Sequence, residues 1–162
     1  MRIGLISDTH SFIHPEVLVL FTNVDLILHA GDIGNEDVLI SLERFAPVQA
    51  VLGNMDAHTF KRQLTEICFL TAEEKNILMM HKPPRIYDKN PTYSLRKKFS
   101  ADIIIHGHTH IPRNEKRGDV LLLNPGSAGS SRVTSNPSVA LLELRQGTEP
   151  KVEIIHLASL PG

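Results

Sequence analysis

The sequence predicts an α/β fold built as a layered sandwich of mixed sheets, and three features of the chain support that class. Short, nearly continuous apolar runs recur through the first two thirds, as in strands buried on both faces. Segments with helical periodicity separate several of these runs, which is the alternation typical of βαβ units. The last third has further strand-like runs without clear helices between them, so a mixed sandwich fits better than a simple doubly wound sheet.

Five strands are predicted in the first two thirds, and they cover 2–7, 24–30, 48–53, 76–81 and 101–107. Helices are predicted over 14–24, 34–47 and 91–99. Pro15 suits the first position of the first helix. Asn35 can cap the second helix, where acidic residues in the first turn favour the positive end of the helix dipole.

Three more strands are predicted in the last third, over 120–126, 138–144 and 151–157. The final run partly alternates between polar and apolar residues, which favours a half-buried strand. We therefore expect antiparallel strands here, forming a second sheet with an apolar edge that could pair subunits into a homo-oligomer.

Length and composition suit one domain spanning residues 1–162, with a formal net charge of −1 and a single cysteine, Cys68. Without a polybasic block, stable nucleic-acid binding is not expected. No run approaches the ~20 apolar residues of a membrane span, so no membrane association is expected. A lone cysteine suits a reducing compartment, which predicts a cytoplasmic protein with Cys68 as a small buried apolar residue.

Residues with metal-ligating side chains follow all five of the first predicted strands. They are Asp8, His10, Asp32, Asn54, His81, His108 and His110. Sites in α/β sheets form beyond the carboxyl ends of the strands, so these strand ends are expected to converge on one crevice. Residues two apart in an extended chain point the same way, so Asp8 with His10, and His108 with His110, are expected to serve one site together.

The chemistry of this set favours transition metals. Two carboxylates, one amide oxygen and four imidazoles provide oxygen and nitrogen ligands without a thiolate. That mixture suits Mn, Fe, Zn, Co or Ni better than an all-oxygen Mg or Ca site. Seven ligands are too many for one tetrahedral ion and fit two ions if one carboxylate bridges them. Two divalent ions beside two aspartates leave positive charge that can hold a bridging hydroxide and attract an anionic substrate, and such metal pairs are a recurring clamp for phosphoryl displacement.

The order of these blocks resembles the calcineurin-like metallophosphoesterases. The family pattern D-x-H, G-D, G-N, lone His and G-H-x-H is matched in order, from Asp8-Thr9-His10 to Gly107-His108-Thr109-His110. The size of the chain, its DTH opening and the NPGS stretch at 124–127 are most similar to the small YfcE/MJ0936-like phosphodiesterase branch. One block alone is a weak signal, whereas five in order over nearly the whole chain are specific.

The resemblance implies a four-layer α-β-β-α sandwich with a dinuclear metal centre. It gives one ion Asp8, His10, Asp32 and His110, and the other Asp32, Asn54, His81 and His108, so that Asp32 bridges. It also implies that a metal-bridging hydroxide hydrolyses a small phosphodiester or other phosphate ester, with Asn54 stabilising the phosphoryl oxygens. Manganese is the expected metal, with Ni, Co, Fe or Zn as alternatives.

Met55 departs from the family pattern. Many members have a histidine at this position that is assigned to protonating the leaving group, and methionine cannot donate a proton. The small branch commonly lacks this histidine too, so modest activity is expected, best with leaving groups that need little protonation. Asn54 and Asp56 are the catalytic candidates, although Asp56 is also typical of a turn or cap carboxylate. The alternative function is a weak or inactive binding or scaffold module on the same fold, which loss of ligands would indicate.

The remaining polar residues receive mostly structural predictions. His29 lies inside an apolar strand and is expected to be a hydrogen-bonded core residue, and His106 is expected to have a structural role beside the ligands. His14 is expected at the surface, and His58 in a solvated loop near the missing histidine. The stretch 124–127 is expected to form a turn near the site. Candidate phosphate contacts are Lys82, Arg85, Arg113 and Arg132.

Overall fold

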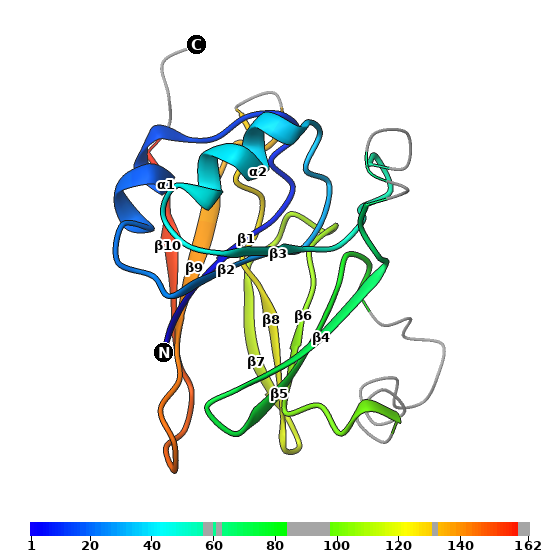
Figure 1. Ribbon diagram of the computed structural model, residues 1–162, viewed down its shortest axis with the longest axis vertical. Coiled ribbons are helices and arrows are strands. Elements are labelled where there is room, and N and C mark those ends of the chain that lie inside the picture. Colours follow the sequence, from blue (N-terminus) through cyan, green and yellow to red (C-terminus); the bar gives the residue numbers. More distant parts are fainter. Residues whose placement is uncertain (57–59, 61–62, 84–97, 131–132, 159–162) are drawn as a thin grey trace.

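Two five-stranded mixed sheets pack face to face in the computed structural model, which describes residues 1–56, 60, 63–83, 98–130 and 133–158 (Figure 1). The predicted α/β sandwich of two mixed sheets is therefore confirmed. Among the described residues, no helix has the length and apolar character needed to cross a membrane.

The first sheet has the strand order β10-β9-β1-β2-β3. Its strands are β1 (Arg2–Ile6), β2 (Leu26–His29), β3 (Val48–Ala50), β9 (Ser138–Glu143) and β10 (Lys151–His156). Strands β1, β2 and β3 run parallel to one another, whereas β9 pairs antiparallel with both β1 and β10. The carboxyl ends of the three parallel strands therefore meet at one edge.

The second sheet has the strand order β4-β5-β6-β8-β7. Its strands are β4 (Ile67–Ala72), β5 (Lys75–Met80), β6 (Ile103–Ile105), β7 (Arg113–Arg117) and β8 (Val120–Asn124). Strands β5, β6 and β8 are parallel, and the two edge strands are antiparallel to their neighbours.

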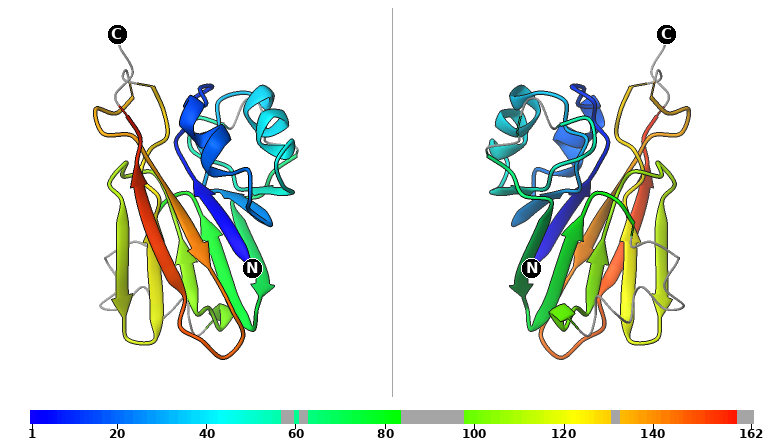
Figure 2. Two further views of the ribbon diagram at one scale, coloured as in Figure 1. Left: turned by 90° about the vertical axis from the view of Figure 1, so that its left-hand side faces the viewer. Right: turned by 90° about the vertical axis from the view of Figure 1, so that its right-hand side faces the viewer.

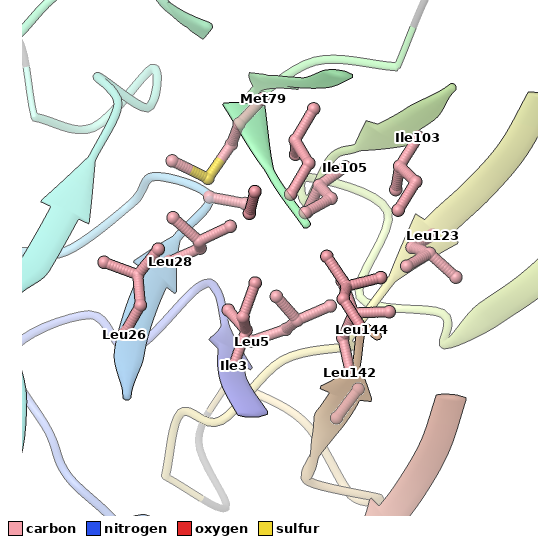
Figure 3. Packing of buried hydrophobic residues seen from close by; sticks show 14 of the residues in the cluster. Ile3, Leu5, Leu26, Leu28, Met79, Ile103, Ile105, Leu123, Leu142 and Leu144 are labelled. Atoms are coloured by element: carbon pink, nitrogen blue, oxygen red, sulfur yellow. The ribbon is translucent and has the colours of Figure 1, made fainter. Parts of the chain in front are cut away.

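The space between the sheets is filled by side chains from both. Ile3 and Leu5 of the first sheet pack in one buried cluster with Met79, Ile103 and Ile105 of the second (Figure 3). Each buried aliphatic side chain of this kind stabilises the fold by about 1.5–3 kcal/mol. This shared core fixes the two sheets relative to each other, so loops that leave different sheets can form one site.

Two helices cover the outer face of the first sheet. They are α1 (Pro15–Leu20) and α2 (Glu36–Glu43), and they lie together on one side of the molecule (Figure 2). Val17 of α1 and Leu42 of α2 are buried in one cluster with Ile6 and Ile27. As predicted, Pro15 begins α1, and the Asn35 side chain caps α2 by accepting a hydrogen bond from Val38 N–H at 3.3 Å.

Part of the outer face of the second sheet is also buried, over β5, β6 and β8. Because side chains alternate along a strand, Leu78, Ile104 and Leu122 point away from the shared core, and Ala101 and Phe99 pack against them. The predicted helix over 91–99 falls largely outside the described residues.

All eight predicted strands are present, but their distribution between the sheets differs from the prediction. The last three were expected to form a second sheet together. Instead, β9 and β10 extend the first sheet, while β8 joins the second sheet parallel to β6. Strands β4 and β7 were not predicted. β7 is polar and largely exposed, so only its pairing with β8 defines it as a strand.

Candidate metal centre

Loops from both sheets meet at the carboxyl ends of β1, β2, β3, β5 and β6, as the sequence predicts. Backbone hydrogen bonds join the loop after β1 to the loop after β2, from Asp8 N to Gly31 O at 2.9 Å and from His10 N to Asp32 O at 3.0 Å. A third bond joins the loops of the second sheet, from Gly107 N to His81 O at 3.0 Å. The loops that carry the candidate ligands are thus tied to one another by their main chains.

Five of the seven candidate ligands have positive φ angles, between 47° and 68°: Asp8, His10, Asp32, His108 and His110. Non-glycine residues adopt this left-handed region uncommonly, and such strained residues cluster at functional sites. The expectation that the D-x-H and H-x-H pairs act from extended chain is therefore wrong. The side chains converge because the loops turn at the ligands themselves.

One group of side chains brings together Asp8, His10 and His110, whose ligand atoms all lie within 4.8 Å of one another. His110 Nε2 is 3.2 Å from Asp8 Oδ1, and the rings of His10 and His110 meet edge to face. His10 Nε2 also lies 3.9 Å from Asp32 Oδ2. These are the four residues that the resemblance assigns to one ion.

A second group is centred on the side-chain oxygen of Asn54. Asn54 Oδ1 lies 3.0 Å from His81 Nε2 and 3.0 Å from His108 Nδ1. His81 Nε2 is also 3.4 Å from Asp32 Oδ2, and Asp8, Asp32 and His81 form another set of atoms within 4.8 Å. Asp32 Oδ2 therefore lies between His10 of the first group and His81 of the second, the position that the resemblance gives to a bridging ligand.

The residues fit a cation, because their acceptor atoms face one another without enough donors. Asp8 Oδ1 is fully buried and accepts no hydrogen bond, although His110 Nε2 lies 3.2 Å from it. His81 Nδ1 lies 2.7 Å from the carbonyl oxygen of Ala30 and must donate its proton there. In the neutral ring, His81 Nε2 then points its lone pair at the lone pairs of Asn54 Oδ1. A proton or a metal ion between them relieves that repulsion, and a second-shell carbonyl that fixes the tautomer is typical of ligating histidines.

The pKa values of the central groups indicate the same demand for positive charge. Burial raises the pKa of Asp8, although Ser7, His81 and His110 partly oppose that effect. Burial also acts on the pKa of Asp32, but hydrogen bonds from His81 and the Met55 N–H outweigh it, so the pKa is lowered. The pKa of His81 is raised, because its contacts with Asp32 and Ala30 outweigh its burial.

Two glycines allow the ligand loops to approach this closely. A Cβ on Gly107 would lie 1.9 Å from Ser7 Oγ and 2.8 Å from Asp8 Oδ2. A Cβ on Gly53 would lie 2.0 Å from Asp32 Oδ1. Any side chain at either position would displace a candidate ligand, which explains the glycine before the histidine and before the asparagine.

Asp56 joins two ligand loops through its carboxylate. It is fully buried, and Oδ1 accepts hydrogen bonds from Ile33 N at 2.9 Å and Gly34 N at 3.0 Å. Oδ2 accepts a third from Gly53 N at 2.8 Å. These contacts favour the turn-carboxylate interpretation of Asp56 over the catalytic one, since neither oxygen is free to meet a substrate.

The sequence prediction missed two serines that support Asp8. Ser7 Oγ donates to Asp8 Oδ2 at 2.6 Å, and Ser127 Oγ donates to the Asp8 carbonyl at 3.0 Å. The only sequence signal for Ser7 is a hydroxyl at the end of an apolar strand, directly before the D-x-H block. The turn predicted at 124–127 does lie beside the site, where Asn124 Nδ2 donates to Gly107 O at 3.1 Å and to Thr109 Oγ1 at 3.0 Å.

The other histidines that the structure describes lie outside the ligand groups. His29 is a buried, hydrogen-bonded core residue as expected, since its Nδ1 accepts from Gly31 N and its Nε2 donates to Thr9 Oγ1. His106 is buried, with Nδ1 3.0 Å from Gly107 O. The surface prediction for His14 is wrong: it is buried at the start of α1, because its Nδ1 accepts from Glu16 N and its Nε2 donates to Ala158 O.

Of the predicted phosphate contacts that the structure describes, one lies at the site and the other lies on an edge strand. Lys82 follows His81 and is exposed at the site. Arg113 instead lies on the edge strand β7 and forms an ion pair with Glu115 at 3.7 Å. Arg85, Arg132 and His58 lie outside the described residues. Cys68, expected to be buried, is only half-buried and its Sγ donates to Gln49 Oε1 at 3.1 Å.

With this arrangement of sheets and ligand loops, the chain belongs to the calcineurin-like phosphoesterase superfamily. Residues 1–147 match the family model described as the calcineurin-like phosphoesterase superfamily domain. The resemblance inferred from the order of the motifs is thereby confirmed, and the protein is assigned to the metallophosphoesterases.

Individual relatives include both named enzymes and a solved structure. The chain is 41% identical to a protein of Methanothermobacter thermautotrophicus named "Probable metallophosphoesterase", over 96% of this chain and 92% of that protein. It is 29% identical to phosphodiesterase MJ0936 of Methanocaldococcus jannaschii, over 88% of this chain and 93% of that protein. Wild-type Vps29 of Entamoeba histolytica complexed with Zn²⁺ superposes with a TM-score of 0.75 and 25% identity, covering 96% and 99% of the two chains.

Proposed function

We propose that this protein is a metal-dependent phosphodiesterase with a dinuclear centre, in which Asp8, His10, Asp32 and His110 hold one ion and Asp32, Asn54, His81 and His108 hold the other. The observation that carries the proposal is the convergence of the candidate ligands into two groups that meet at Asp32, with the buried Asp8 Oδ1 accepting no hydrogen bond. Membership of the metallophosphoesterase family and the similarity to a named phosphodiesterase support it.

The chemistry divides between the ions and the chain. Divalent ions held by these ligands, for which we propose manganese, would supply the Lewis acidity that activates a water and polarises the phosphoryl oxygens. Asp32 sets the spacing of the two ligand groups, since its Oδ2 lies between His10 and His81. The amide of Asn54 orients the phosphoryl group, and Lys82 adds a positive charge beside it. Asp56 keeps the loops of Asp32 and Asn54 in place.

Met55 determines which esters react readily. Its side chain is 64% exposed at the position where many relatives have a histidine, and its backbone N–H donates to Asp32 Oδ1 at 2.8 Å. Because methionine cannot protonate a leaving alcohol, the proposal is for modest activity, highest with leaving groups such as nitrophenols. We place this activity in the cytoplasm, since one free cysteine suits a reducing compartment.

The second candidate function is a binding or scaffold module, and the structural similarity to Vps29 is the observation that favours it. An enzyme and a scaffold differ in their need for intact ligands. All seven candidate ligands are retained and placed close together, which supports the enzyme.

The test uses metal-free protein and bis(p-nitrophenyl) phosphate with Mn, Ni, Co or Zn supplied. Hydrolysis is expected with at least one metal, and Asp32→Ala and His110→Ala are expected to lower kcat/KM at least 100-fold. His156→Ala, an exposed histidine on β10, is the matched control and should keep wild-type activity. No hydrolysis with any of the metals would leave the scaffold function as the better account.

A further inference from the structure

A pocket of about 550 Å³ opens beside the candidate metal centre, between the loop after β3 and the ends of β4 and β5. Asn54 and His81 form part of its wall, and both belong to the second ligand group. A phosphoryl group held at that ligand group therefore has one of its ester substituents next to the pocket. The volume is within the range of small-molecule binding sites, which are about 300–1,000 Å³.

Away from the candidate metal centre, the part of the pocket wall that the structure describes is mainly apolar. Leu52, Ile67 and Met80 provide the apolar surface, and Ile67 and Met80 are direct cross-strand neighbours on β4 and β5. Ile67 is 43% exposed, although it is a large aliphatic side chain on an edge strand. A bound apolar group would cover it and remove its surface from water, which is the main source of affinity in such a site.

The charged groups of the pocket lie at other parts of its wall. Lys82 directly follows His81, so its ammonium suits the anionic phosphoryl end of a ligand. Glu66 directly precedes Ile67 and gives the pocket a negative group on the side of β4. That carboxylate disfavours a second anionic group on the ester substituent, so a monoanionic diester with an uncharged substituent fits the pocket best.

We propose that this pocket binds the organic ester group of the substrate, and that the preferred substrates are phosphodiesters carrying an uncharged, mainly apolar substituent of ring size, such as an aryl group. The inference rests on the proposed function and adds the substrate class to it. Ile67 is the specificity-determining residue, because it is the most exposed of the three apolar side chains that line the pocket.

The experiment compares two ligands that share the group bound by the metal ions. Manganese-loaded protein is titrated calorimetrically with phenylphosphonate and with methylphosphonate, so the contribution of the phosphonate to binding is common to both. Wild type is expected to bind phenylphosphonate at least tenfold more tightly. Ile67→Glu is expected to reduce the ratio of the two dissociation constants, methylphosphonate over phenylphosphonate, to below threefold. Ile67→Thr, which keeps the β-branched shape, is expected to reduce this ratio to an intermediate value.

Phe69→Glu is the matched control. Phe69 is 48% exposed and lies two residues along the same strand on the same face, but it does not line the pocket. It is expected to keep the wild-type ratio, which separates loss of the pocket surface from general damage to β4. Circular dichroism of each variant checks that β4 still folds.

The outcomes distinguish this proposal from the proposed function. Three results would contradict the proposed role of the pocket. They are a wild-type affinity ratio near one, no binding of either phosphonate, and an equal fall of the ratio in Ile67→Glu and Phe69→Glu. Hydrolysis of bis(p-nitrophenyl) phosphate together with a ratio near one would keep the enzyme and reject the pocket. Selective binding of phenylphosphonate without hydrolysis of any diester would keep the pocket and reject the enzyme.

Discussion

Replacing Asp56 by asparagine tests whether this carboxylate holds the ligand loops together. The change keeps the shape of the side chain but turns one acceptor oxygen into an NH₂ donor. In the better orientation, Oδ1 still accepts from Ile33 N and Gly34 N, while the new NH₂ faces Gly53 N–H, which now has no acceptor.

The expected loss of unfolding free energy in Asp56→Asn follows from these three hydrogen bonds. Losing one hydrogen bond to a charged group and leaving a buried donor unpaired costs about 1.5–3 kcal/mol. The other two bonds lose the assistance of the negative charge, which brings the expected loss of unfolding free energy to about 2–4 kcal/mol. A typical domain has 5–15 kcal/mol of stability, so Asp56→Asn should remain folded.

Urea unfolding of the metal-free protein measures this loss, and Asp25→Asn is the matched control. Asp25 is exposed and accepts one backbone hydrogen bond, from Arg2 N at 2.6 Å, so its replacement should cost less than about 1 kcal/mol. Manganese affinity should also fall in Asp56→Asn, because Gly53 and Ile33 are adjacent to Asn54 and Asp32. If Asp56→Asn stays within about 0.5 kcal/mol of wild type, the carboxylate does not hold the loops as described.

Two further predictions concern residues close to the ligands. Burial lowers the pKa of His29 from 6.5 to about 4. The unfolded chain therefore takes up a proton below pH 6.5 that the folded chain refuses until about pH 4. The contribution of His29 to the free energy of unfolding is fully present above pH 6.5. About 3 kcal/mol of this contribution is lost as the pH falls from 6.5 to about 4. Urea unfolding between pH 4.5 and 7 should show a steeper loss of stability in wild type than in His29→Gln, and equal slopes would contradict the burial argument. Gly107→Ala forces a Cβ against Ser7 and should weaken manganese binding at least tenfold by calorimetry, whereas Gly118→Ala, with open space around it, should leave the affinity unchanged. Equal affinities for the two alanine variants would show that the loop tolerates the side chain.

Strands such as β1, β2 and β6 could be predicted from the sequence because their apolar runs are almost uninterrupted, and these strands are buried in both sheets. The assignment of each strand to a sheet could not be predicted. β9 and β8 have equally apolar sequences, yet β9 pairs with β1 and β8 pairs with β6. That choice depends on long-range pairing. β7 was missed because its residues are polar and exposed, so no periodicity marks them.

The identity of the candidate ligands could be predicted, but their local geometry could not. The Asp, Asn and His blocks can be recognised in the sequence because the ligand atoms belong to particular side-chain types. The left-handed conformation of Asp8 and His108 has no such signal, since nothing in the sequence distinguishes a turn at a ligand from extended chain. The role of Asp56 was equally ambiguous until its three backbone partners were visible.

The central claim is that Asp32 links two ligand groups into one dinuclear centre. Metal analysis of wild type and Asp32→Ala after equilibration with manganese and removal of free metal tests it most directly. Two ions per chain are expected in wild type and fewer than one in Asp32→Ala, because both groups lose a ligand. Two ions retained in Asp32→Ala, or a single ion in wild type at saturation, would contradict it.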